Sequence, residues 1–282
     1  MVEVRYKARF GNNLFQYCLG RILAEELGFA LQAVPIEGFP NTAQTVAGAV
    51  HEGPELVLTG QQIPLADILA DRSPRRIVLD GWFQHASYYR PYRDRIRHWL
   101  AMDRAIHVPD VKPDLVVNVR RTDYIQLGWA LPFTYYEEAV GRLLPAGGDV
   151  WIVTDDAADP FFRQFRRWRP RFFKGNPLEQ MLFMTCAPRL VMSQSTFSWW
   201  PAFLSESQQT ACPVPTFGCW AVGSAGIGID LIERDRFLCI ECREPYQPTL
   251  ADRWHQKRRA LWRRVVLAAN RRLKLSLREP AV

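Results

Sequence analysis

Residues 115–124, LVVNVRRTDY, join a run of apolar side chains to two arginines and a carboxylate. A short run rich in valine and leucine, without proline or glycine, is typical of a strand buried in a parallel sheet. Ligands bind outside the carboxyl ends of such strands, where Arg120 and Arg121 follow the run. Because consecutive side chains of an extended chain point to opposite sides, we expect one arginine to face a bound anion and the other to brace the scaffold. The alternative is a pair of surface arginines.

Strand-like and helix-like segments alternate on both sides of this stretch. Before it, the pattern predicts a strand at 2–6, a helix at 14–27 ended by Gly28, a strand at 76–81 and a helix at 88–100. From residue 115 on, it predicts strands at 115–119, 150–153, 189–193 and 211–216, and helices at 134–144, 159–168, 177–186 and 199–207. Such alternation indicates βαβ units, parallel sheets and therefore an α/β fold.

The length of 282 residues suits two modest α/β domains. The polar segment 107–113, with two prolines, is the best linker candidate. We therefore expect an N-terminal domain over 1–108, a nucleotide-binding domain over 113–250 and a basic tail over 251–282. Residues 252–278 carry ten Lys and Arg and one acidic residue, a charge of +9, so the rest of the +7 chain carries −2.

The composition narrows the class of protein further. Nearly half of the residues are apolar and 12% are aromatic, as in a folded globular chain. The first residues lack the apolar core of a secretion signal, and no run reaches the ~18 apolar residues of a membrane span, so we expect a cytoplasmic protein. Cys212, Cys219, Cys239 and Cys242 could be imagined as a four-thiolate zinc site, but the first pair is too widely spaced. Reduced cysteines are the favoured interpretation.

Two carboxylates follow the predicted strand at 150–153. Thr154, Asp155 and Asp156 come directly after it, at the edge where ligands of such sheets bind. Adjacent carboxylates diverge, which does not suit a metal, whereas a single carboxylate can accept hydrogen bonds from a ribose or a base. Capping of the next helix by one of the two is an equally good interpretation.

Four hydroxyl side chains lie at and after the end of the predicted strand at 189–193: Ser193, Ser195, Thr196 and Ser198. Proline is tolerated in the first turn of a helix, so Pro201 predicts a helix start near 198–200. Hydroxyls at a helix N-terminus favour a phosphate, although a single capping serine is the alternative. With the arginine and the carboxylate they suit a nucleoside diphosphate. The chain has no P-loop lysine motif and no GxGxxG, which disfavours kinases, NTPases and dinucleotide oxidoreductases.

Four segments together resemble the fucosyltransferases. Residues 9–17, RFGNNLFQY, resemble the GNQxFQY turn of the α-1,2-fucosyltransferases (glycosyltransferase family 11) and the RFGN loop of protein O-fucosyltransferases. Residues 118–124, NVRRTDY, resemble the HxRRxD motif shared by α-1,2-, α-1,6- and protein O-fucosyltransferases, with Asn118 where most relatives have histidine. Residues 154–156 and 195–200, STFSWW, resemble the SDD and SSFSWW segments of the same family.

The resemblance implies a GT-B fold, in which two Rossmann-like domains face each other across a cleft. It implies an inverting, metal-independent fucosyltransferase without a cofactor, which moves fucose from GDP-fucose to a sugar hydroxyl of a surface polysaccharide or lipid-linked glycan. The alternatives are a transferase for a different GDP-sugar, and a non-catalytic sugar-nucleotide or glycan-binding protein on the same fold.

The resemblance also implies roles for individual residues. Arg120 would contact the donor β-phosphate and assist its departure, and Arg121 would brace the site. The other donor contacts would come from Asn12, Asn118, Asp155 or Asp156, Ser195 and Thr196. Asn118 can donate and accept hydrogen bonds like the histidine it replaces. Asp123 is the nearest carboxylate for a general base, and a structural role is its alternative.

The C-terminal segment 252–276 predicts one basic amphipathic helix with Trp254, Leu261 and Trp262 among its arginines. Such a helix can lie peripherally on the anionic cytoplasmic face of the inner membrane, which suits a lipid-linked acceptor. The alternative, a helix packed back across the two domains, is equally favoured. Nucleic acid is not expected as a partner, because no recognised binding motif accompanies the basic residues.

Overall fold

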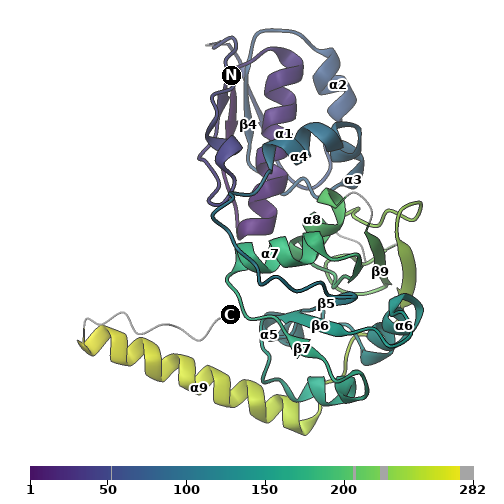
Figure 1. The fold of residues 1–282 in the computed structure, drawn as a ribbon. Helices are drawn as coiled ribbons and strands as arrows, with labels where there is room; N and C mark the ends of the chain where they lie inside the picture. The colour runs from purple at the N-terminus through teal and green to yellow at the C-terminus, as the bar shows by residue number, and fades with distance from the viewer. Residues whose placement is uncertain (52, 206–207, 223–227, 274–282) are drawn as a thin grey trace.

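The computed structural model describes residues 1–273 except 52, 206–207 and 223–227. Two parallel sheets, each flanked by helices, make up the fold (Figure 1). The first sheet has four strands in the order β2-β1-β4-β3. These strands are β1 (Val2–Val4), β2 (Leu31–Gln32), β3 (Glu55–Leu58) and β4 (Arg76–Leu79). The expected α/β class and the parallel pairing are thus confirmed in the N-terminal half.

The helices around this sheet are α1 (Phe10–Leu27), η1 (Pro40–Ala43), α2 (Leu65–Ala70), α3 (Ala86–Tyr89), η2 (Arg90–Tyr92) and α4 (Arg93–Trp99). Gly28 ends α1 with a left-handed φ of 70°, as the sequence predicted. The prediction of one helix over 88–100 was wrong, because that region is divided into three short helices. Pro91 has no N–H to donate and blocks a continuous α-helix at this point.

The second sheet has six parallel strands in the order β10-β9-β8-β5-β6-β7. They are β5 (Leu115–Val119), β6 (Val150–Thr154), β7 (Arg171–Phe172), β8 (Arg189–Val191), β9 (Gln209–Pro215) and β10 (Leu238–Cys242). All five residues of β5 are buried and the strand lies inside the sheet, as its apolar run predicted. The carboxyl ends of β5, β6 and β8 therefore meet at one edge.

The helices of the second half are α5 (Thr122–Gln126), α6 (Phe133–Leu143), η3 (Pro160–Trp168), α7 (Pro177–Cys186) and α8 (Thr196–Leu204). The predicted start of α8 near 198–200 was wrong, since Ser195 is its N-cap and Pro201 lies inside it. Capping by the Ser195 side chain and backbone bonds to its carbonyl start the helix one turn before the proline. The predicted helices at 134–144 and 177–186 are confirmed.

Aromatic side chains join the two sheets through α1 and α8. The ring of Phe15 in α1 lies 5.0 Å from that of Trp199 and 4.6 Å from that of Trp200 in α8. Trp200 Nε1 also donates to the carbonyl oxygen of Gly11 at 2.8 Å. One continuous hydrophobic cluster contains residues of both sheets. The two halves of the chain therefore share a packed core beneath the N-termini of α1 and α8.

The last described element is α9 (Leu250–Leu273), which projects from the second half as an arm (Figure 1). Its first turns pack on η3. The helix predicted over 252–276 is present up to residue 273, and residues 274–282 of the expected basic tail lie outside the described residues. Among the described helices, none is long and apolar enough to cross a membrane.

The cysteines do not form the imagined zinc site. Cys212 and Cys239 are partners in the register of β9 and β10. Within the described part of the chain, no group of three or more His, Cys, Asp or Glu side chains could hold a metal ion. All six cysteines are free.

Candidate functional site

A cavity of about 620 Å³ opens between the two halves of the chain. Residues 8–12, before and at the start of α1, line it from the N-terminal side. The opposite wall comes from the carboxyl ends of β5 and β6 and from the N-termini of α7 and α8. Six of the eight predicted donor-site residues line it, together with Asp123: Asn12, Asn118, Arg120, Asp155, Ser195 and Thr196, whereas Arg121 and Asp156 do not.

Arg120 is the central cation of this cavity. Its Nη2 lies 2.6 Å from Asp123 Oδ1, its Nη1 lies 3.2 Å from Asp155 Oδ2, and its side chain is 17% exposed. The guanidinium also stands over the ring of Tyr124, at 5.1 Å from the centroid. Burial by itself lowers the pKa of Arg120, but the neighbouring Asp155 and Asp123 carboxylates outweigh it and raise that pKa. Arg120 is therefore a fixed, permanently charged anion-binding group.

Asp155 holds the loop that follows β5. Its Oδ1 accepts the backbone N–H of Arg121 at 2.9 Å, and its Oδ2 accepts the Thr122 hydroxyl at 2.5 Å. The side chain is only 4% exposed, although it lines the cavity. The carboxylate thus fixes the position of Arg120 and still borders the space where a ligand would lie.

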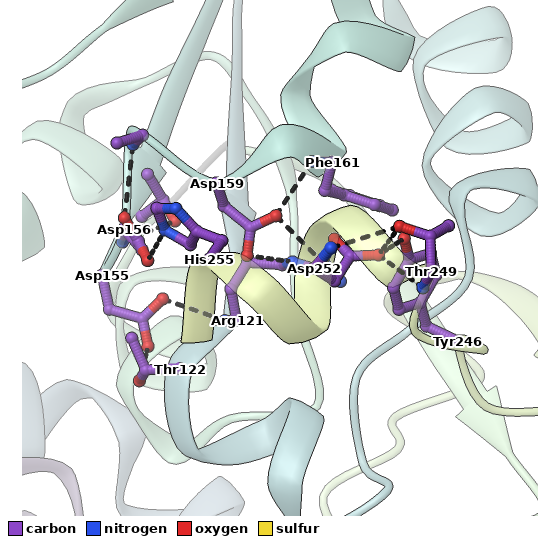
Figure 2. A network of polar contacts seen from close by, with 12 residues as sticks. Arg121, Thr122, Asp155, Asp156, Asp159, Phe161, Tyr246, Thr249, Asp252 and His255 are labelled. Atoms are coloured by element: carbon purple, nitrogen blue, oxygen red, sulfur yellow. Dashed lines mark hydrogen bonds and ion pairs between the residues drawn. The ribbon is translucent and has the colours of Figure 1, made fainter. Parts of the chain in front are cut away.

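Arg121 and Asp156 do not line the cavity, and both contact α9 instead (Figure 2). The Arg121 guanidinium is buried between the rings of Phe161, at 4.1 Å, and Tyr246, at 4.3 Å. Asp156 Oδ2 lies 2.8 Å from His255 Nε2 and 2.9 Å from Arg259 Nη1. The structure therefore does not bring these two predicted donor-site residues to the cavity, because each follows a cavity residue on extended chain.

Asn118 ties three strand ends together beneath the cavity. Its Nδ2 donates to the Val153 carbonyl at 3.2 Å, and its Oδ1 accepts the Ser193 hydroxyl at 2.6 Å. The residue is 2% exposed. These bonds leave one amide N–H of Asn118 for a ligand.

The four hydroxyls near α8 have different partners. Ser198 is buried and donates to the backbone carbonyls of Ser193 and Ser195. Ser195 Oγ accepts the N–H of Phe197 at 3.2 Å, and Ser195 and Thr196 both line the cavity. The N-terminus of a nine-residue helix therefore borders the cavity, with two of the four hydroxyls beside it.

The N-terminal wall approaches α8 closely. A Cβ at Gly11 would lie 2.8 Å from Thr196 Oγ1 and 3.1 Å from the Phe197 nitrogen, so glycine is required there. Asn12 Oδ1 accepts Gln84 Nε2 at 2.7 Å, which orients the Asn12 amide at the cavity. The close approach of Gly11 to Thr196 brings the 9–17 segment and the 195–200 segment together.

Several residues that line the cavity were not expected from the sequence: Arg9, Tyr124, Trp129, Asn176 and Gln180. Arg9 and Tyr124 stand inside the motifs at 9–17 and 118–124, so the motifs could have included them. Asn176 caps α7 in a capping box with Glu179, a pattern that is readable in the sequence as N-x-x-E. Trp129, whose ring packs edge-on against Tyr124 at 5.8 Å, has no signal in the sequence.

Comparisons with known proteins gave similarity at the level of structure. No protein-family model matches the chain, and no curated protein matches it in sequence. A fucosyltransferase NodZ from Bradyrhizobium superposes with a TM-score of 0.47 and 13% identity, over 72% of this chain and 92% of that one. FUT1 of Arabidopsis thaliana, a mutant in complex with GDP, gives 0.46 and 10%, over 74% and 68%. The heptosyltransferase WaaC of E. coli with ADP gives 0.45 and 10%, over 92% and 99%.

Proposed function

We propose that this protein is a glycosyltransferase that takes its sugar from a nucleoside-diphosphate donor, with GDP-fucose as that donor. The observation that carries the proposal is that Arg120 and the N-terminus of α8 line the same cavity. A guanidinium and a helix N-terminus both bind phosphate oxygens. The cavity lies between two parallel α/β units, as it does in the GT-B fold expected from the sequence.

The same two groups account for departure of the nucleotide. When the bond between the anomeric carbon and the diphosphate breaks, negative charge accumulates on the leaving oxygen while the sugar becomes oxocarbenium-like. Arg120 is already fixed by Asp123 and Asp155, so it needs no reorganisation as that charge develops. In this mechanism the Arg120 guanidinium and the Ser195 and Thr196 end of α8 stabilise the leaving diphosphate.

Asp123 is the carboxylate that we assign as general base. It lines the cavity, and its side chain is 42% exposed, whereas that of Asp155 is 4% exposed. Its Oδ1 is held by Arg120, and its other oxygen has capacity to accept a proton from an acceptor hydroxyl. Attack by that hydroxyl on the face opposite the diphosphate would invert the anomeric configuration.

The nucleoside end of the donor is assigned to the floor and side of the cavity. Asn118 has one N–H left after its bonds to Val153 and Ser193, and Asp155 borders the same space. The acceptor is assigned to the N-terminal side of the cavity. Arg9 and Asn12 line that side, where a glycan acceptor would enter. The proposed acceptor is a sugar hydroxyl of a surface polysaccharide or lipid-linked glycan.

Binding of nucleoside diphosphates tests the donor class. The wild-type protein should be stabilised in thermal unfolding by GDP, and more weakly by UDP or ADP at the same concentration, because only ligands of the native state raise the melting temperature. Equal stabilisation by all three would contradict the guanosine assignment. No stabilisation by any of the three nucleotides would contradict the proposal that the protein uses a nucleotide-sugar donor.

A sugar-release assay then separates the transferase from a non-catalytic binder. Wild type incubated with GDP-fucose should release GDP slowly to water and faster with a panel of glycan acceptors. GDP binding in calorimetry without release of sugar from GDP-fucose or other GDP-sugars would instead favour a sugar-nucleotide-binding protein.

We also propose that α9 contacts the cytoplasmic face of the inner membrane peripherally. Trp254, Leu261 and Val265 follow spacings of seven and four residues, which place them on one helix face, and they are 60%, 63% and 52% exposed. Exposed basic side chains flank this face, among them Arg253, Lys257, Arg258 and Arg264. Exposed apolar groups bordered by cations suit the interface of an anionic bilayer.

Vesicle binding tests this contact. Sedimentation should show binding of wild type to vesicles with anionic lipid and weak binding to neutral vesicles. Leu261→Glu should reduce binding by about tenfold, since a carboxylate cannot enter the apolar interface and repels anionic lipid. Val34→Glu, at a residue 67% exposed in the N-terminal half, is the matched control and should bind like wild type. Equal binding of both variants would contradict the proposal.

A further inference from the structure

At the end of β5 and at the end of β6, two consecutive residues have different surroundings. Arg120 and Asp155 line the cavity, and the next residues, Arg121 and Asp156, contact α9 (Figure 2). We propose that the first turns of α9 are part of the scaffold of the donor site, and that Asp252 is a positioning residue for Arg120 and Asp155. The inference rests on the proposed function for its consequence in donor binding, but its structural part stands on the contacts alone.

Asp252 is the anchor of α9. Its Oδ2 accepts the Tyr246 hydroxyl at 2.6 Å, and the backbone N–H and hydroxyl of Thr249 at 2.7 and 2.6 Å. Its Oδ1 lies 3.3 Å from Arg121 Nη2, and the residue is 1% exposed. The start of α9 is therefore fixed to the fold by a fully buried carboxylate, which solvent does not compete for.

Arg121 forms ion pairs with Asp252 and with a second carboxylate, Asp159. Asp159, the N-cap of η3, accepts Arg121 Nε at 3.1 Å and Nη2 at 3.3 Å. The guanidinium is enclosed by the Phe161 and Tyr246 rings and is 1% exposed. Because the buried cation lies between two anions from different helices, neither η3 nor α9 can shift without moving Arg121.

Arg121 is connected to the cavity through its backbone. Its N–H donates to Asp155 Oδ1 at 2.9 Å, and the next hydroxyl, of Thr122, donates to Asp155 Oδ2 at 2.5 Å. The same Oδ2 lies 3.2 Å from Arg120 Nη1. A continuous chain of polar contacts thus runs from Asp252 through Arg121 and Asp155 to the cavity cation.

A second contact acts on the neighbouring strand. Asp156 Oδ2 lies 2.8 Å from His255 Nε2 and 2.9 Å from Arg259 Nη1, both on α9. Asp156 directly follows Asp155, so α9 holds the strand ends that carry both members of the Arg120–Asp155 pair. Removal of α9 would therefore change the cavity as well as any membrane contact, and truncation at residue 250 would not separate the two.

Asp252→Asn is the sharpest variant, because it keeps the size of the side chain and removes its charge. We expect about a tenfold loss in GDP affinity by calorimetry and in kcat/KM, within the range for positioning effects transmitted through contacts. Asp252→Glu should recover part of the loss. Glu244→Gln, at an exposed carboxylate eight positions earlier in the chain, is the matched control and should keep the GDP affinity and kcat/KM of wild type.

Hydrogen exchange tests the positioning without any ligand. In Asp252→Asn, backbone amides of residues 120–125 should exchange faster than in wild type, while those of β1 and β4 should keep their wild-type rates. If exchange at 120–125 is faster in Asp252→Asn but neither wild type nor variant binds a nucleotide, the positioning role of Asp252 is retained and the proposed function is rejected. A variant with a lowered melting temperature but wild-type GDP affinity, and unchanged exchange at 120–125, would overturn the inference.

Discussion

Arg120 and Asp155 form an ion pair across neighbouring strands, with Nη1 and Oδ2 3.2 Å apart. The register of β5 and β6 places them opposite each other, because Val119 pairs with Thr154 and these two residues come next. The pair therefore follows from parallel strand pairing and not from a flexible loop. A guanidinium fixed in this way borders the cavity, where a diphosphate would bind.

Arg120→Ala should lower kcat by about 100- to 1,000-fold, the effect of removing one group that stabilises developing negative charge. Arg120→Lys should retain part of the activity, because a lysine supplies the charge without the two-pronged geometry. Steady-state kinetics with a GDP-sugar measures both, and circular dichroism checks the fold. Near wild-type turnover in Arg120→Ala would remove Arg120 from the mechanism.

Asp123→Asn should lower kcat by about 100-fold or more if the carboxylate is the general base. GDP affinity should stay close to that of wild type, since the amide can still accept a hydrogen bond from Arg120. Steady-state kinetics with a GDP-sugar and an acceptor measures kcat, and calorimetry measures the GDP affinity. A joint loss of GDP affinity and melting temperature would show that Asp123 only holds Arg120.

Gly11→Ala should destabilise the fold by about 1–3 kcal/mol, since its Cβ would lie 2.8 Å from Thr196 Oγ1 at the cavity wall. GDP binding should weaken with it, because Thr196 must move. Gly141→Ala is the control in α6, where a Cβ meets no atom within 4 Å, and it should stabilise by ~0.5–1 kcal/mol. Urea unfolding of both variants measures the difference, and equal effects would contradict the close approach of α1 and α8.

Cys239 should be the most acidic thiol of the chain. A hydrogen bond from the Cys212 thiol lowers the pKa of Cys239 to about 7, while burial raises the pKa of Cys212 well above its usual range and keeps it protonated. Because the lowered pKa favours thiolate above about pH 7, alkylation of Cys239 should have its midpoint there. Cys186, which is exposed but has a raised pKa, should react only at higher pH.

Cys212→Ala gives the control for this thiol. Without the S–H donor, the alkylation midpoint of Cys239 should rise toward the ordinary thiol value of ~8.5. Mass spectrometry of the labelled peptides across a pH series measures both midpoints. An unchanged midpoint in the variant would show that Cys212 does not determine the acidity of Cys239.

Local signals predicted the parallel sheets well where the pattern was strong. The apolar run of β5 and the glycine after α1 both have the predicted conformations, because burial and a left-handed φ depend on a few neighbouring residues. The short strands β2 and β7, of two residues each, were not predicted. A pair of residues carries no readable period, and its pairing is decided by the neighbouring strand.

Helix boundaries near proline were the least predictable part. Pro201 predicted a start at 198–200, but the Ser195 cap begins α8 earlier. Pro91 sits within a region predicted as one helix and divides it. Both errors arise because a proline removes one hydrogen bond, and whether the helix continues depends on caps and packing that act together.

The sequence by itself determined the α/β class, the polar strand ends and the alternation that separates Arg120 from Arg121. These features depend on the order of residues along one strand, which tertiary contacts do not change. Only the tertiary structure decided that Ser195 and Thr196 reach the cavity while Ser193 and Ser198 serve the fold. It also decided that Arg121 meets Asp252, 131 positions later. Such contacts depend on how distant elements pack, and a local pattern does not contain that information.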